Sequence, residues 1–336
     1  MRRGAINTRS IFLFIIILMT ASLLLACNAG EKQEQSIELK LGDSEISFLN
    51  KDEGVNILAA EDDYIKGLSS YDYAAKLKTD TALNLEERRE FYKDAVLAWN
   101  DSEKQKISSA IEDIDKRIAD LKLNLPEEIG FIKTNGTEEG GAAYTRGVCI
   151  VLPEDYVAKT SDDRLRNLII HELFHVYSRY NEDLHDDLYG IINYKRCEEL
   201  EFPDEIKDLK ISNPDAPLNN YYIECTYNGK SYNFIPVIYS SAAYEGGSFF
   251  RTLIDEMLAI EVIDGKPEPI YEDGKIVLAN KEDLEDFYEK IGTNTDYTFH
   301  PEETLADNFV ILVMNEEAPS KWVIDEMKKV IQGEPK

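Results

Sequence analysis

Two histidines and a glutamate, His171, Glu172 and His175, form an H-E-x-x-H motif inside a stretch with a strongly helical pattern. Residues four apart lie on the same face of an α-helix, so both imidazoles can reach one metal ion. Neutral imidazole is a good ligand for Zn²⁺, and Glu172 is close enough to take a proton from a metal-bound water without being a ligand itself. The motif therefore predicts the working part of a zinc hydrolase.

The alternative interpretation of the motif is an amphipathic core helix whose two histidines bind no metal. The segment already has ample apolar surface for packing, supplied by Leu165, Leu168, Ile169, Phe174, Val176 and Tyr177. The histidines are not needed for that purpose, so the metal interpretation is favoured. Thr160, with Asp163 three residues later, predicts a capping box at the start of this helix.

A catalytic zinc site also needs a third protein ligand and an open position for water. Pro301 suits the first turn of a second helix, and acidic residues in that turn suit its dipole. Glu303 and Asp307 share a face of this helix, so Glu303 could complete a His₂Glu site while Asp307 accepts the Nδ1–H of a zinc-bound histidine. Glu302 is turned about 100° from Glu303, so we expect metal binding without it. His300, just before the helix, remains an alternative ligand.

In these two motifs the chain resembles the gluzincins, the thermolysin-like zinc metallopeptidases. Their second motif is Glu-x-x-x-Asp with a small residue before the aspartate, which Glu303, Ala306 and Asp307 match. The resemblance covers about a tenth of the chain, and it implies a zincin-like catalytic domain that hydrolyses peptide bonds. One departure is that Glu303 lies 128 positions after His175. A large insertion, at about residues 181–299, must therefore fold between the two metal helices.

The function that we predict is hydrolysis of a peptide or protein substrate by a zinc-bound water that Glu172 activates. A donor near the zinc would stabilise the oxyanion, and the candidates are His300, Tyr244, Tyr144 and Arg146. Two other classes stay open. One is a surface lipoprotein that binds a ligand or partner and keeps a degenerate metal site; an intact Glu172 argues against it. The other is a zinc amidase that acts on cell-wall material.

The first 26 residues have the pattern of a lipoprotein signal peptide. Arg2, Arg3 and Arg9 form a basic start, and the apolar run that follows is too short for a membrane span. The run ends in Leu-Leu-Ala before Cys27, which looks like a bacterial lipobox with cleavage before Cys27 and a lipid on its sulfur. A plain secretory signal is the alternative. We expect a protein anchored to the cell membrane through Cys27, on the extracytoplasmic face.

The chain is strongly acidic, with 65 Asp and Glu against 37 Lys and Arg and a formal charge of −28. The signal carries three positive charges and no acid, so cleavage would take the charge to −31. Such a surface disfavours nucleic acid and anionic lipid headgroups as partners. Three cysteines follow Cys27. An oxidising compartment permits one disulfide among them, for which Cys197 and Cys225 are the preferred pair, whereas Cys149 lies in an apolar run and is expected to be a buried thiol.

The pattern of elements predicts an α+β fold, in which a helical N-terminal region precedes a catalytic domain with a small mixed sheet. The domains that we expect are a tether and small β-hairpin at 27–60, a helical region at 61–126 and the metallopeptidase domain at 127–336. Within 61–126, isoleucines and leucines at spacings of three and four mark one long helix with a buried stripe, from Ile107 to Leu125.

Strands are expected at 129–133 and 147–152, and the second of these would lie along the cleft and pair with an extended peptide. Inside the insertion, Asn228-Gly229 and Asp273-Gly274 predict the turns of two hairpins. Further helices are expected near Ser248–Leu258, Lys281–Ile291, Pro301–Met314 and Lys321–Ile331.

Overall fold

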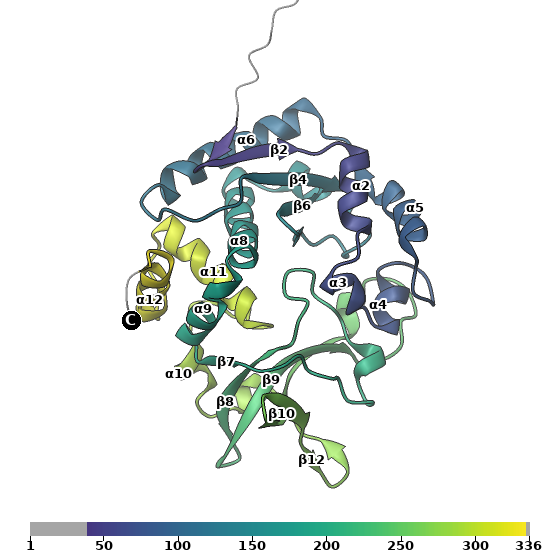
Figure 1. Ribbon diagram of the computed structural model, residues 1–336, viewed down its shortest axis with the longest axis vertical. Coiled ribbons are helices and arrows are strands. Elements are labelled where there is room, and N and C mark those ends of the chain that lie inside the picture. Colours follow the sequence, from purple (N-terminus) through teal and green to yellow (C-terminus); the bar gives the residue numbers. More distant parts are fainter. Residues whose placement is uncertain (1–38, 334–336) are drawn as a thin grey trace, which may run out of the picture. The chain divides into compact units, whose positions relative to one another are not determined.

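A six-stranded sheet lies in the upper part of the view in Figure 1. The structure is a computed structural model that describes residues 39–333, which form one unit. The strand order is β1-β2-β4-β6-β5, with β3 paired to β4. The central strands β2, β4 and β6 are parallel, and β5 is antiparallel to β6 at the edge. The strands of this sheet are β1 Lys40–Leu41, β2 Ser44–Phe48, β3 Val96–Leu97, β4 Glu128–Thr134, β5 Tyr144–Arg146 and β6 Cys149–Pro153.

This order changes one expectation from the sequence. The strand expected at 147–152 exists as β6, but it is internal, between β4 and β5. The edge that a ligand could approach is β5, a strand of three residues. The expected small hairpin is confirmed as β1 and β2, and because β2 pairs with β4 it belongs to the same sheet as β6.

A lower antiparallel sheet is formed by the chain between the helix of the H-E-x-x-H motif and the helix of Glu303 (Figure 1). Its order is β11-β10-β9-β8-β7, and β14 pairs with β10. The hairpins expected at Asn228-Gly229 and Asp273-Gly274 are both confirmed, the second as the separate pair β12 and β13. The strands are β7 Tyr194–Arg196, β8 Tyr221–Tyr227, β9 Lys230–Ser240, β10 Leu253–Ile263, β11 Lys266–Pro269, β12 Tyr271–Glu272, β13 Lys275–Ile276 and β14 Leu278–Ala279.

The helix expected at Ser248–Leu258 is wrong. A single 3₁₀ turn at Phe249–Thr252 leads directly into β10, which pairs with β9 from Leu253 opposite Ser240 to Ile260 opposite Asn233. Met257 to Ile260 of this strand are buried, alternately on the two faces of the sheet. A short continuous apolar run of this kind does not distinguish a buried strand from a buried helix. The other 3₁₀ turns are Glu182–Leu184, Lys207–Leu209 and Lys281–Asp283.

Three long helices pack around one hydrophobic core with the two sheets. They are α6 Asp101–Ile118, α8 Asp162–Tyr180 and α11 Pro301–Met314. The remaining helices are α2 Lys51–Ala59, α3 Asp63–Lys66, α4 Ser70–Ala75, α5 Leu85–Ala95, α7 Glu154–Lys159, α9 His185–Ile191, α10 Phe287–Ile291 and α12 Lys321–Ile331. The bounds predicted for α11 and α12 are confirmed. The region expected to be helical at 61–126 holds α3 to α6, and α6 ends at Ile118 rather than at Leu125.

Helix α8 carries the H-E-x-x-H motif, and its N-cap lies one residue later than predicted. Ser161, not Thr160, is the N-cap, and its Oγ accepts a hydrogen bond from the Arg164 N–H. Phe174 of α8 packs on Phe309 of α11, with ring centroids 5.5 Å apart. This contact, together with the apolar residues around it, holds the polar faces of the two helices against each other.

The predicted disulfide between Cys197 and Cys225 is absent, since all three cysteines of the described chain are free thiols. Cys225 packs into the main core, whereas Cys197 packs into a different hydrophobic cluster of the lower sheet. The two sulfur atoms therefore lie in separate surroundings. Cys149 is buried, as expected.

The signal segment and Cys27 lie outside the described residues. Within 39–333, no helix is both long and apolar enough to cross a membrane.

Candidate metal and active site

The three predicted metal ligands meet where α8 crosses α11. His171 Nε2 lies 3.1 Å from Glu303 Oε2, and His175 Nε2 lies 3.5 Å from the same oxygen. One ligand atom from each of the three residues falls within 4.8 Å of the others. Nitrogen and oxygen atoms at these separations can surround one ion with bonds of about 2.0–2.2 Å.

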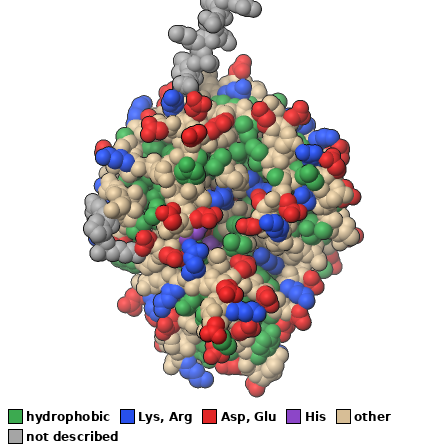
Figure 2. Space-filling model, viewed as in Figure 1, with side chains coloured by type: hydrophobic (Ala, Val, Ile, Leu, Met, Phe, Trp, Pro, Cys, Tyr) green, Lys and Arg blue, Asp and Glu red, His purple; other side chains and the backbone are tan. Residues whose placement is uncertain are grey.

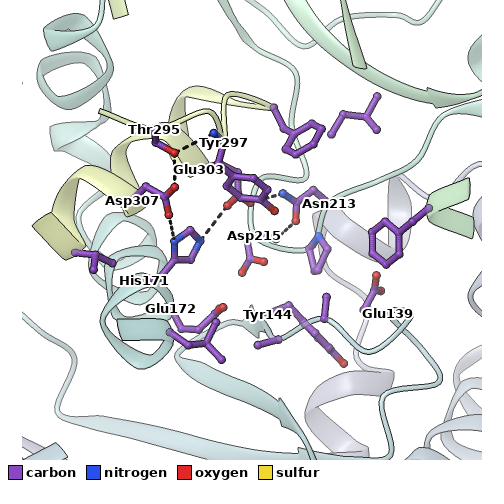
Figure 3. A pocket seen from close by; sticks show the side chains of 18 of the residues that line it. Glu139, Tyr144, His171, Glu172, Asn213, Asp215, Thr295, Tyr297, Glu303 and Asp307 are labelled. Carbon is purple, nitrogen blue, oxygen red and sulfur yellow. Dashed lines mark hydrogen bonds and ion pairs between the residues drawn. The ribbon is translucent and has the colours of Figure 1, made fainter. Parts of the chain in front are cut away.

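A carboxylate behind each histidine turns its Nε2 atom toward this point. Asp307 Oδ1 lies 2.9 Å from His171 Nδ1, as expected from the sequence (Figure 3). Glu302 Oε1 lies 2.9 Å from His175 Nδ1, which the sequence analysis did not foresee. Each carboxylate can accept the Nδ1–H of its histidine and leave Nε2 free for a metal.

Glu302 is itself held in place by two hydroxyl groups. Tyr189 OH and Ser178 Oγ donate to its Oε2 at 2.6 and 2.8 Å. Helix geometry predicts that Glu302 does not share the face of Glu303, and Glu302 is not part of the group formed by His171, His175 and Glu303. That geometry did not predict the residues that Glu302 contacts instead. Ser178 lies on α8 one turn beyond His175. Its hydroxyl, at a spacing that places it on the same helix face as His175, is a sequence feature that could have indicated the hydrogen bonds around Glu302.

Two buried polar atoms of the motif have no hydrogen-bond partner in the described part of the chain: His175 Nε2 and Glu172 Oε2. Both residues are almost fully buried, at 1% and 2% exposure. Buried polar atoms are normally satisfied, so an orphaned pair at one point indicates a place for a ligand. The donor set of two imidazoles and one carboxylate is one that Zn²⁺ accepts, and the residues therefore fit the metal.

The electrostatics also favour a positive charge here. Burial lowers the pKa of His171, but its hydrogen bonds with Asp307 and Glu303 outweigh this and raise the pKa to about 10. Burial acts in the same direction on His175, and the carboxylates of Asp215 and Glu303 raise its pKa well above the ordinary value. Burial raises the pKa of Glu303, but His175 and His171 hold it well below its usual range. Carboxylates thus create a site that attracts protons or a cation.

The ligand cluster opens into a cavity of about 910 Å³. In the space-filling view, histidine side chains are visible in a hollow at the centre of the face (Figure 2). Much of the lining away from the candidate ligands is apolar, although Lys76, Glu139 and Arg164 also line the cavity. The apolar part includes Leu168, Ile211, Ile238, Phe249, Phe250, Leu253, Phe299 and Val310. It has room for a substrate side chain beside the reacting group.

Three residues that the sequence analysis missed reach into the cavity (Figure 3). Asn213 Nδ2 donates to Glu303 Oε1. Asp215 lies beside Glu172 and His175. Tyr297 packs against His171 with ring centroids 6.0 Å apart, and the nearby Glu303 carboxylate, with burial, raises its pKa. All three lie within the insertion, far along the chain from His171.

Three of the four candidate oxyanion donors lie outside the cavity. His300 is the buried N-cap of α11, where its Nδ1 accepts from the Glu302 N–H, and burial lowers its pKa to about 4. Tyr244 OH donates to the Gly247 carbonyl, and Arg146 pairs with Asp62 at 2.7 Å. None of these three lines the cavity. Tyr144 does line it, but its hydroxyl donates to Glu138.

Comparisons of the chain with models of protein families, with curated proteins and with solved structures found no match. The assignment of function therefore depends on the chemistry of the site.

Proposed function

We propose that the protein is a zinc-dependent peptidase with a zincin-like catalytic domain of the gluzincin type. The observation that carries this proposal is the convergence of His171, His175 and Glu303 on one point, beside a buried glutamate that is not part of the triad. A purely structural metal site has no use for such a glutamate, which favours an enzyme over a binding module.

Zinc held by the three ligands would lower the pKa of a bound water and polarise the substrate carbonyl. Glu172 accepts one proton from the attacking water through its unpartnered Oε2. It then returns this proton to the leaving nitrogen as the C–N bond breaks, which gives a carboxylic acid and an amine. Asp307 and Glu302 keep the two imidazole rings in position throughout.

The test is hydrolysis by purified protein that begins at Cys27 or just after it. We expect products from a peptide library, detected by mass spectrometry, with loss of activity on chelation and recovery on addition of Zn²⁺. Muropeptides are assayed in parallel. Cleavage of muropeptides alone would replace the proposed peptidase with a cell-wall amidase, and a stable zinc complex that cleaves neither substrate would contradict an enzymatic role.

Tyr297 is the side chain best placed to stabilise the oxyanion, because its ring packs on His171 at the cavity wall. We expect Tyr297→Phe to lower kcat by ~10²- to 10³-fold and leave zinc content unchanged. Steady-state kinetics with metal analysis measures both quantities. Tyr180→Phe, which alters an exposed tyrosine at the end of α8, is the control. A wild-type kcat in Tyr297→Phe would remove Tyr297 from the mechanism.

The proposed location is the outer face of the cell membrane, with a lipid on Cys27. We expect Cys27→Ser to abolish acyl labelling and to release or mislocalise the protein, because acyl chains supply the anchor. Labelling with a fatty-acid analogue and membrane fractionation test this, with Cys197→Ser as the control. Unchanged fractionation of Cys27→Ser would contradict the lipoprotein proposal.

A further inference from the structure

Asp215 places a second carboxylate beside the general base. One oxygen of Asp215 lies within 4.8 Å of Glu172 and His175, in a cluster that does not include His171 or Glu303. Asp215 also lines the cavity (Figure 3). It therefore stands next to the place where the substrate reacts, rather than among the three metal ligands.

Neutral donors hold this carboxylate in position. Its Oδ1 accepts hydrogen bonds from the Thr145 N–H at 2.7 Å and the Thr145 hydroxyl at 2.6 Å. Arg179 Nη2 donates to the backbone oxygen of Asp215 at 3.3 Å. Burial raises the pKa of the Asp215 carboxyl, and the nearby charges of His175 and Arg179 lower it. Its Oδ2 has no hydrogen bond within residues 39–333. Together with the orphaned Glu172 Oε2, the cavity presents unpartnered carboxylate oxygens that suit a cationic ligand.

The same contact closes the sheet edge. Thr145 is the middle residue of the edge strand β5, and its N–H points away from β6 and is taken by Asp215. A polypeptide that continued along this edge would need that N–H for a backbone hydrogen bond. The position of Asp215 therefore suits a substrate whose chain ends here.

We propose that Asp215 binds the free α-ammonium group of the substrate, so that the enzyme is an aminopeptidase. This inference rests on the proposed peptidase function. In an amino acid, the α-nitrogen lies about 2.5 Å from the carbonyl carbon, and a charge-assisted hydrogen bond adds about 2.8 Å. The reacting carbonyl then lies about 5 Å from Asp215, which matches its closeness to His175 and Glu172. The side-chain ammonium of a substrate lysine lies about 6 Å from its Cα, so it would extend beyond Asp215.

The test compares two ligands that differ only at the α-nitrogen, leucine hydroxamate and N-acetyl-leucine hydroxamate. A leucine side chain suits the apolar lining of the cavity. Calorimetry on the zinc-loaded protein measures binding without turnover. We expect the free amine to bind about 10- to 100-fold more tightly than the acetylated form. Equal affinity of the wild type for both ligands, or binding of neither, would overturn the proposal.

The variant Asp215→Asn assigns this preference to one residue. Asparagine keeps an oxygen for the two Thr145 hydrogen bonds but lacks the charge, so we expect the preference to disappear. The control is Asp204→Asn, which removes an exposed carboxylate that pairs with Lys207, outside the cavity. A preference that persists in Asp215→Asn would exclude Asp215 as the anchor. If the preference is present but no peptide is hydrolysed, the amine site stands and the peptidase function fails.

Discussion

We expect Glu172→Gln to retain zinc while peptide hydrolysis falls by ~10²-fold or more. The substitution keeps the shape of the side chain but removes its capacity to accept a proton. Glu172 is 2% exposed, and it is not part of the triad of His171, His175 and Glu303, so the ligands should be undisturbed. Zinc content by atomic absorption and kcat/KM on one peptide measure the two effects separately.

The control for this variant is Glu112→Gln, which changes an exposed glutamate on α6. It should behave as the wild type in both measurements. A wild-type rate in Glu172→Gln would show that Glu172 is not the base. Loss of zinc together with activity would instead show that Glu172 helps to hold the metal.

The parts of the site that the sequence predicted are those whose geometry is local. A spacing of four on one helix brings His171 to His175, and the same spacing brings Glu303 to Asp307. The residues of each pair lie on one helix face, because helix geometry alone determines which residues share a face. The contact between the two pairs could be expected only from the donor types that a zinc site requires, and the structure does bring them together.

The residues that were missed depend on contacts between distant segments. Asn213 reaches Glu303 across 90 residues, and Asp215 reaches Thr145 across 70. No periodicity in either segment records such a contact. The same limit applies to β10, whose apolar run was expected to be helical until its pairing with β9 was known, and to Cys197 and Cys225, which pack into different clusters.

The structure also revises what is expected of the residue next to the third ligand. Because helix geometry turns Glu302 away from Glu303, the sequence predicts metal binding without Glu302. It nevertheless accepts from His175 Nδ1 and is fixed by Tyr189 and Ser178. Glu302 and Asp307 thus have equivalent positions, one behind each histidine.

A series of variants at these positions should therefore give graded effects on zinc affinity. Glu303→Ala removes a ligand and should lower zinc affinity by more than about 100-fold, whereas Asp307→Ala and Glu302→Ala should each lower it by ~10–100-fold. Titration of the metal-free proteins with zinc against a competing chelator measures all three. Glu302→Gln, which keeps an oxygen for His175 Nδ1, is the milder variant should removal of the buried carboxylate disturb folding.

The decisive comparison in this series is between Glu303→Ala and His300→Ala. His300 caps α11 and lies outside the cavity, so its loss should affect helix stability and leave zinc affinity within a few-fold of the wild type. Normal zinc binding by Glu303→Ala, with loss of zinc in His300→Ala, would indicate a three-histidine site and contradict the gluzincin proposal. The 3.1 Å and 3.5 Å distances from Glu303 Oε2 to the two imidazoles favour the opposite result.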